Sequence, residues 1–159
     1  MNVLIVYYSR GGRTAKVAQE IYNAVPHEKT TIRIHPREKE GGFFKCLAQA
    51  QGRKKVSIED TSFDCAHYDA IVLGTPLWDG RPSPFLKLWI DKAQNMAGKR
   101  VALVVTCRGG SGKITDVMEG ILKAKGVSIT DTLIMRSLFK YSAKKLREAF
   151  EFGKEFSKA

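Results

Sequence analysis

The first fourteen residues constrain the fold most strongly. Residues 3–8 form a continuous apolar run, and the polar turn at residues 9–14 (SRGGRT) follows it directly. Apolar residues then recur at helical spacing, at positions 17, 18, 21, 22 and 25. A buried strand that passes through a glycine-rich turn into a helix is typical of α/β folds.

This turn predicts an anion site. Its backbone N–H groups and the positive end of the helix dipole point at the same place, which suits a phosphate. Two hydroxyls and two arginines can add donors and positive charge. The residues expected to hold the phosphate are Ser9, Arg10, Gly11, Gly12, Arg13 and Thr14.

Strand and helix patterns alternate along the rest of the chain. Further strands are expected at residues 30–34, 70–73 and 101–105, and a fifth starts at 127–129 and continues loosely through 133–135. Helices are expected at residues 43–50, ending near Gly52, after Ser83 as N-cap with Pro84 first, at residues 114–122 before Gly126, and after Ser142.

Five such units with apolar central strands predict a doubly wound parallel sheet with helices on both faces. Ligands of open α/β sheets bind at the carboxyl ends of the strands. The turns after the first, third and fourth strands have the residues of a ligand site, and a strand order of 2-1-3-4-5 makes their ends adjacent. We therefore expect one site built from three loops.

Composition bounds the setting of this site. The chain has 159 residues, of which 43% are hydrophobic, and we expect a single domain over residues 1–159. The cysteines, Cys46, Cys65 and Cys107, form no C-x-x-C pair, so free thiols in the cytoplasm are expected. The sequence shows no apolar run of membrane-span length, no signal-peptide pattern at its start, and no metal-ligand spacing at His27, His35 and His67.

The net charge is +11 at pH 7, and the excess of Lys and Arg is spread along the chain. A nucleic-acid binder concentrates such charge on one face or element, so we expect no nucleic-acid partner. A solvated basic surface is the simpler interpretation, and a docking face for an acidic partner is the alternative.

Three loops resemble those of the flavodoxin-like family. Residues 8–14 (YSRGGRT) resemble its phosphate loop, of form [S/T]-x-T-G-x-T. Residues 68–84, which begin YDAIVLGTPLWDG, are similar to the segment that flanks the flavin ring, and residues 105–110 (VTCRGG) resemble the loop on its other side. The resemblance covers nearly the whole chain and implies a five-stranded doubly wound sheet of order 2-1-3-4-5.

The resemblance also implies bound FMN. By position, residues 9–14 would hold the phosphate, and the ring would lie against Pro76, Leu77, Trp78, Asp79 and Gly80 on one side. Thr106, Cys107, Arg108, Gly109 and Gly110 would approach its pyrimidine edge and ribityl side. No catalytic residue is assigned.

Individual residues carry further expectations. Trp78 is expected to stack on the ring, because it has no helical partner, whereas Trp89 lies at core spacing. Gly80 allows the preceding peptide to flip toward a ligand, and a plain turn is the alternative. Cys107 is expected to be a small residue near the ligand, and a reactive thiol activated by Arg108 is the alternative. Positive charge at Arg81 and Arg108 would favour the reduced, anionic flavin.

The resemblance leaves several functions open. The first is an FMN electron carrier, a monomer or homodimer, that exchanges electrons with redox protein partners, which can present acidic faces. The alternative is an NAD(P)H-dependent FMN or quinone reductase. A metal-binding receiver domain would need acidic residues after the first and third strands, where this chain has Ser9-Arg10 and Gly74-Thr75. A flavodoxin-like binding module without flavin is the fourth interpretation.

Overall fold

The computed structural model describes residues 1–38, 45, 48–49, 51–52 and 54–158. Its strands are β1 (Asn2–Tyr8), β2 (Glu28–Ile34), β3 (Ala70–Trp78), β4 (Arg81–Pro82), β5 (Arg100–Cys107) and β6 (Ile129–Arg136). Its helices are α1 (Arg13–Ala24), α3 (Pro84–Lys92), α4 (Ile114–Lys123) and α5 (Ala143–Phe156). The residues that carry the helix expected at 43–50, which are Phe43, Phe44, Cys46, Leu47 and Ala50, lie outside the described residues.

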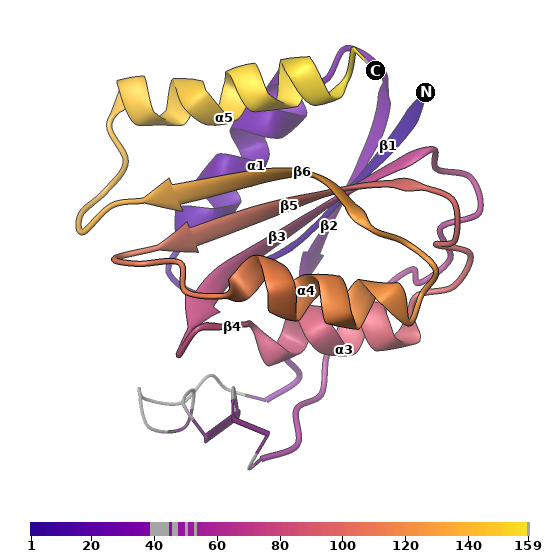
Figure 1. Ribbon diagram of the computed structural model, residues 1–159, viewed down its shortest axis with the longest axis vertical. Helices are drawn as coiled ribbons and strands as arrows, with labels where there is room; N and C mark the ends of the chain where they lie inside the picture. The colour runs from indigo at the N-terminus through magenta and orange to yellow at the C-terminus, as the bar shows by residue number, and fades with distance from the viewer. Residues whose placement is uncertain (39–44, 46–47, 50, 53, 159) are drawn as a thin grey trace.

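The sheet has the order β2-β1-β3-β5-β6, and all of these neighbours pair in parallel. This confirms the predicted order 2-1-3-4-5 for the parallel strands. The prediction missed a sixth strand, the two-residue β4, which pairs antiparallel with the end of β3. Figure 1 shows α1 and α5 on one face of the sheet and α3 and α4 on the other.

Strand β3 continues to Trp78, so the expectation that it ends at residue 73 was wrong. Its pairing with β1 stops at Gly74, whereas its pairing with β5 continues to Pro76. Pro76 has no backbone N–H to donate. It lies beyond the part of β3 that pairs with β1, so no hydrogen bond to β1 is lost there. Gly74 allows the close pairing with β1, since an added Cβ would lie 2.8 Å from the Cβ of Tyr7.

The β3–β4 hairpin turns at Asp79 and Gly80. Their φ angles are 50° and 71°, so both residues are left-handed, as a tight two-residue hairpin turn requires. Neither of the prolines that follow belongs to the turn itself: Pro82 lies in β4 and Pro84 opens α3. The hairpin fixes the direction in which residues 78–80 face.

Strand β6 is one continuous strand rather than a loose one. Its pairing with β5 shifts register between Val101 and Ala102, which pair with Ile129 and Asp131. This bulge leaves Thr130 outside the ladder, and its hydroxyl donates to the carbonyl of Val101 over 3.2 Å.

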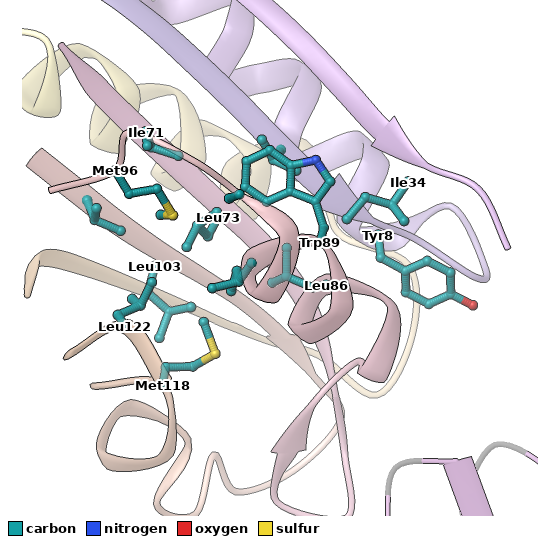
Figure 2. Close-up of a cluster of buried hydrophobic side chains, with 14 of the residues drawn as sticks. Tyr8, Ile34, Ile71, Leu73, Leu86, Trp89, Met96, Leu103, Met118 and Leu122 are labelled. Carbon is teal, nitrogen blue, oxygen red and sulfur yellow. The ribbon is translucent and has the colours of Figure 1, made fainter. Parts of the chain in front are cut away.

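Helix α3 begins as the sequence predicted. The Ser83 hydroxyl accepts a hydrogen bond from the Phe85 N–H over 3.3 Å, and Pro84 occupies the first helical position. The helix directs Trp89 into the core, where it is fully buried, as expected. Figure 2 shows Trp89 in the same cluster as Ile34 and Leu86, with Tyr8 at the edge of the cluster and its phenol oxygen directed away from it.

A second core cluster fills the other face of the sheet, under α1 and α5. The two clusters together hold the central strands rigid on both faces, so the loops at the carboxyl ends of β1, β3 and β5 have a fixed base. No helix in the described part of the chain is long and apolar enough to cross a membrane.

Candidate functional site

The carboxyl ends of β1, β3 and β5 and the loops that follow them border a cavity of about 760 Å³, within the size range of small-molecule sites. Its lining is Ser9, Arg10, Gly11, Arg13, Thr14, Pro76, Leu77, Trp78, Asp79, Thr106, Cys107, Arg108, Gly109 and Gly110. Every one of these residues was predicted from the sequence. Of the predicted set, only Gly12 and Gly80 do not line the cavity.

The loop after β1 presents backbone donors to this cavity. Gly12 has φ 80° and caps α1. Of the first N–H groups of the helix, that of Ala15 donates to the Ser9 hydroxyl over 3.1 Å and that of Lys16 to the Gly12 carbonyl over 3.0 Å. The N–H groups at the start of a helix lack acceptors within the helix. Within the described part of the chain, the N–H groups of Arg13 and Thr14 are therefore left to bind a ligand.

Hydroxyls add to these donors. Ser9 is buried, and its oxygen accepts from Ala15, so its own proton can still be donated into the cavity. Thr14 and Thr106 are both buried, and their hydroxyl oxygens lie 2.8 Å apart. One of the two hydroxyls donates to the other, and the acceptor keeps a proton for a ligand. This pair also joins the first loop of the cavity to the third.

The expected role of Arg13 in holding phosphate required a guanidinium directed into the turn. The structure does not place it there. The guanidinium donates to the carbonyls of Ser137 and, over 3.5 Å, Cys107, and its Cζ lies 4.9 Å from the ring centroid of Tyr141. Its Nε is buried without a partner among the described residues. Arg13 therefore ties the first loop to the chain after β6, and it also lines the cavity.

Two arginines that hydrogen-bond to loops near the cavity were not predicted from the sequence to have a role there. Arg33 donates to the carbonyl of Ser9 over 3.4 Å, and Arg136 donates to the Ser111 hydroxyl over 2.9 Å. Both lie near the carboxyl ends of strands that flank the site, β2 and β6. The sequence pattern that could have identified these two arginines is a positively charged residue near the end of a strand that flanks the site.

Trp78 lines the cavity from the end of β3. Its ring meets Tyr8 edge to face, with centroids 5.6 Å apart, and Phe85 at 6.3 Å. Because Phe85 belongs to α3, the expectation that Trp78 has no helical partner was wrong. The hairpin is also fixed at its base, where the Ser83 N–H donates to the Thr75 hydroxyl over 2.8 Å. The indole is therefore held in place without a ligand.

Cys107 is buried at the base of the third loop, with its Sγ 3.3 Å from the Gly109 carbonyl oxygen. Burial raises the pKa of this thiol, and the opposing effect of Arg136 is smaller. The thiol is therefore protonated at neutral pH, which favours a packing role over a reactive one. Arg108 is exposed on the cavity wall, whereas Arg81 lines a separate groove beside α3 and α4.

The residues present fit a phosphorylated planar ligand. A Cβ added at Gly11, Gly109 or Gly110 would meet no atom within 4 Å, so these positions border open space. The amide and hydroxyl donors of residues 9–14 and the aromatic ring of Trp78 border the same cavity. Among the described residues, no three His, Cys, Asp or Glu side chains group as metal ligands.

The family model of the NADPH-dependent FMN reductases matches residues 1–135. No curated protein sequence matches the chain significantly.

Several solved structures share the fold. One is a flavoprotein from Lactobacillus acidophilus in complex with FMN, 24% identical, with a TM-score of 0.69 over 84% of this chain and 92% of the other. A flavoprotein of Bacteroides uniformis is 18% identical, with a TM-score of 0.75 over 99% and 98%. Flavodoxin 1 of Bacillus cereus is 19% identical, with a TM-score of 0.64 over 99% and 98%. The chain thus has the flavodoxin-like fold.

Proposed function

Because the chain belongs to the family of NADPH-dependent FMN reductases, we propose that it holds FMN in this cavity and passes electrons between redox protein partners. The observation that carries the proposal is the convergence of three loops, far apart in the sequence, on one cavity at the carboxyl ends of β1, β3 and β5. The proposal includes a single domain in the reducing cytoplasm, where Cys65 and Cys107 stay free thiols.

Each loop has a distinct task in this proposal. The amides of Arg13 and Thr14 and the hydroxyl of Ser9 bind the phosphate. The indole of Trp78 orients the ring from the β3–β4 hairpin, and residues 106–110 close the other side. FMN, when bound, supplies the one- and two-electron chemistry, so the chain has only to bind, orient and tune it.

The open rim of the cavity favours a carrier. Asp79, Arg108, Gly109 and Gly110 are all exposed, and they border the cavity on two sides. A carrier needs one exposed edge of the cofactor so that a partner protein can approach it. An enzyme that holds a small substrate would need this edge covered.

The family match supports a second candidate, an NADPH-dependent reductase of flavins or quinones. In that case the nicotinamide must lie against the ring, in the space beside residues 106–110, to transfer its hydride. The exposed cations Arg10 and Arg108 would then face the phosphates of the dinucleotide.

One experiment separates the two. The purified yellow protein is mixed anaerobically with NADPH, and then assayed with NADPH and a quinone in steady state. The carrier predicts flavin reduction and quinone turnover no faster than with free FMN at equal concentration. Turnover well above the free-FMN rate would establish the reductase instead. A colourless protein that takes up no FMN would contradict both.

A further inference from the structure

We propose that residues 137–140, the docking loop, form the anchor of a surface that binds an acidic redox protein; the inference rests on the proposed electron-transfer function. Leu138 and Phe139 are 68% and 81% exposed, the highest values among the exposed large hydrophobic residues of the described chain. Adjacent exposed side chains of this size are the kind of residue that protein interfaces bury at their centre.

The docking loop is held in place by three hydrogen bonds. The Ser137 N–H donates to the Cys107 carbonyl over 3.0 Å, and the Arg13 guanidinium donates to the Ser137 carbonyl. The Phe139 N–H donates to the Ser137 hydroxyl over 3.3 Å. These contacts fix the base of the loop, so little order has to be imposed on it when a partner binds.

The surroundings of the loop are cationic. Beside it lies a hollow of about 570 Å³, lined by Gly11, Arg13, Arg108, Leu138, Phe139 and Lys140. This lining contains three cations and no carboxylate. Such a surface complements a partner with acidic groups around an apolar patch, and it attracts that partner before contact.

A second copy of this chain fits the surface poorly. In a two-fold interface the same patch faces itself, so Arg108 and Lys140 would come close to their own copies. Each chain also carries a net charge of +11, which adds a longer-range repulsion. The charges therefore favour an acidic partner over self-association.

The docking loop adjoins the proposed FMN cavity. Gly11, Arg13 and Arg108 line both the hollow and the cavity, so the two share a wall. A partner seated on Leu138 and Phe139 would thus lie beside the cofactor, as electron transfer requires. Weak, charge-steered contacts of small area are typical of such encounters.

The test uses a reduced acidic [2Fe–2S] ferredoxin as the probe, mixed anaerobically with the FMN-loaded protein. The ferredoxin cluster loses one electron and the bound flavin gains it, and stopped-flow absorbance gives the second-order rate constant. We expect this constant to fall about tenfold or more between 50 and 500 mM NaCl. It should also fall about tenfold in the double variant Leu138→Ser, Phe139→Ser.

A charge variant and a matched control locate the effect. Lys140→Glu should slow the reaction at low salt by about threefold or more, whereas Lys154→Glu should leave it unchanged. Lys154 is exposed near the end of α5. This end of α5 lies at the opposite end of the sheet from the docking loop, because the Phe156 carbonyl accepts a hydrogen bond from Arg100 at the start of β5. FMN affinity and reduction by dithionite should be unchanged in all three variants, which shows that they fold.

Two outcomes would overturn the inference while leaving the proposed function intact. One is wild-type transfer rates in the double variant with normal FMN content. The other is a wild-type dimer in analytical ultracentrifugation that the double variant converts to monomer, since a second copy would then cover the loop. A failure of the proposed function would be distinct, because it shows either as proteins that bind no FMN or as NADPH–quinone turnover well above the free-FMN rate in every variant.

Discussion

At the scale of single residues, two buried hydroxyls join the first loop of the cavity to the third. Thr14 lies at the start of α1 and Thr106 near the end of β5, and their oxygens are 2.8 Å apart. Helix start and strand end are thereby fixed relative to each other. When a buried hydroxyl loses its hydrogen-bond partner, the free-energy cost of removing it from water is no longer compensated.

This pair predicts a non-additive effect on stability. Thr14→Val should lower the free energy of unfolding of the FMN-free protein by about 1–3 kcal/mol, because Thr106 is left buried without this partner. The double variant Thr14→Val, Thr106→Val should cost clearly less than the sum of the two single variants, since neither hydroxyl is then stranded. Urea unfolding followed by circular dichroism measures all three, and strict additivity would show that the two hydroxyls do not interact.

Arg108 and Arg81 offer a second comparison between residues. Only Arg108 lines the cavity, so its charge lies closer to a bound flavin than that of Arg81. A unit charge about 10 Å away, at an effective dielectric constant near 40, contributes roughly 0.8 kcal/mol. Arg108→Gln should therefore lower the potential of the second one-electron step, which forms the reduced anion, by about 35 mV.

Arg81→Gln is the matched control, and its shift should be clearly smaller. A spectroelectrochemical titration of the FMN-loaded variants measures both potentials. Equal shifts in the two variants would mean that the position of the charge relative to the cavity has been assigned wrongly.

At the scale of the elements, two helical glycines face opposite environments. Gly153 in α5 lies against α1: an added Cβ would be 3.0 Å from the Cα and carbonyl oxygen of Ile21 and 3.1 Å from the Cβ of Ala24. Gly120 in α4 is exposed, and a Cβ there would meet no atom within 4 Å. The close approach of α1 and α5 therefore depends on Gly153, whereas nothing in the packing requires Gly120.

The same substitution should thus have opposite effects at the two sites. Gly120→Ala should raise the free energy of unfolding by about 0.5–1 kcal/mol, because alanine loses less backbone entropy in a helix. Gly153→Ala should lower it by about 1–3 kcal/mol, because the two helices must move apart. Thermal unfolding followed by circular dichroism measures both, and a stabilised Gly153→Ala variant would contradict the packing of α5 on α1.

The sequence was sufficient for most elements, because each was bounded by a strong local signal. Ser83 and Pro84 marked the start of α3, and Ser142 marked that of α5. The extension of β3 to Trp78 was not predictable in the same way, since it depends on pairing with β5 and with the residues after the turn. Strand pairing is a long-range effect that no window of sequence contains.

At the scale of the whole molecule, strand order creates the site. Strands β1, β3 and β5 are neighbours in the sheet, so loops that start about 70 and 100 residues after the first one meet at one edge. This rule explains why the residues around the cavity could be predicted from the sequence. The direction of Arg13 could not, because it is determined by carbonyls at the end of β5 and just after β6, whose placement depends on the folded sheet.

The central claim is that the loop after β1 binds the phosphate of FMN. Calorimetric titration of the FMN-free protein with FMN and with riboflavin tests it most directly, because the two ligands share the ring and differ in the phosphate. Charge-assisted hydrogen bonds contribute about 1.5–3 kcal/mol each, so FMN should bind at least about 100-fold more tightly than riboflavin. Equal affinities for the two ligands, or no binding of FMN, would contradict the account.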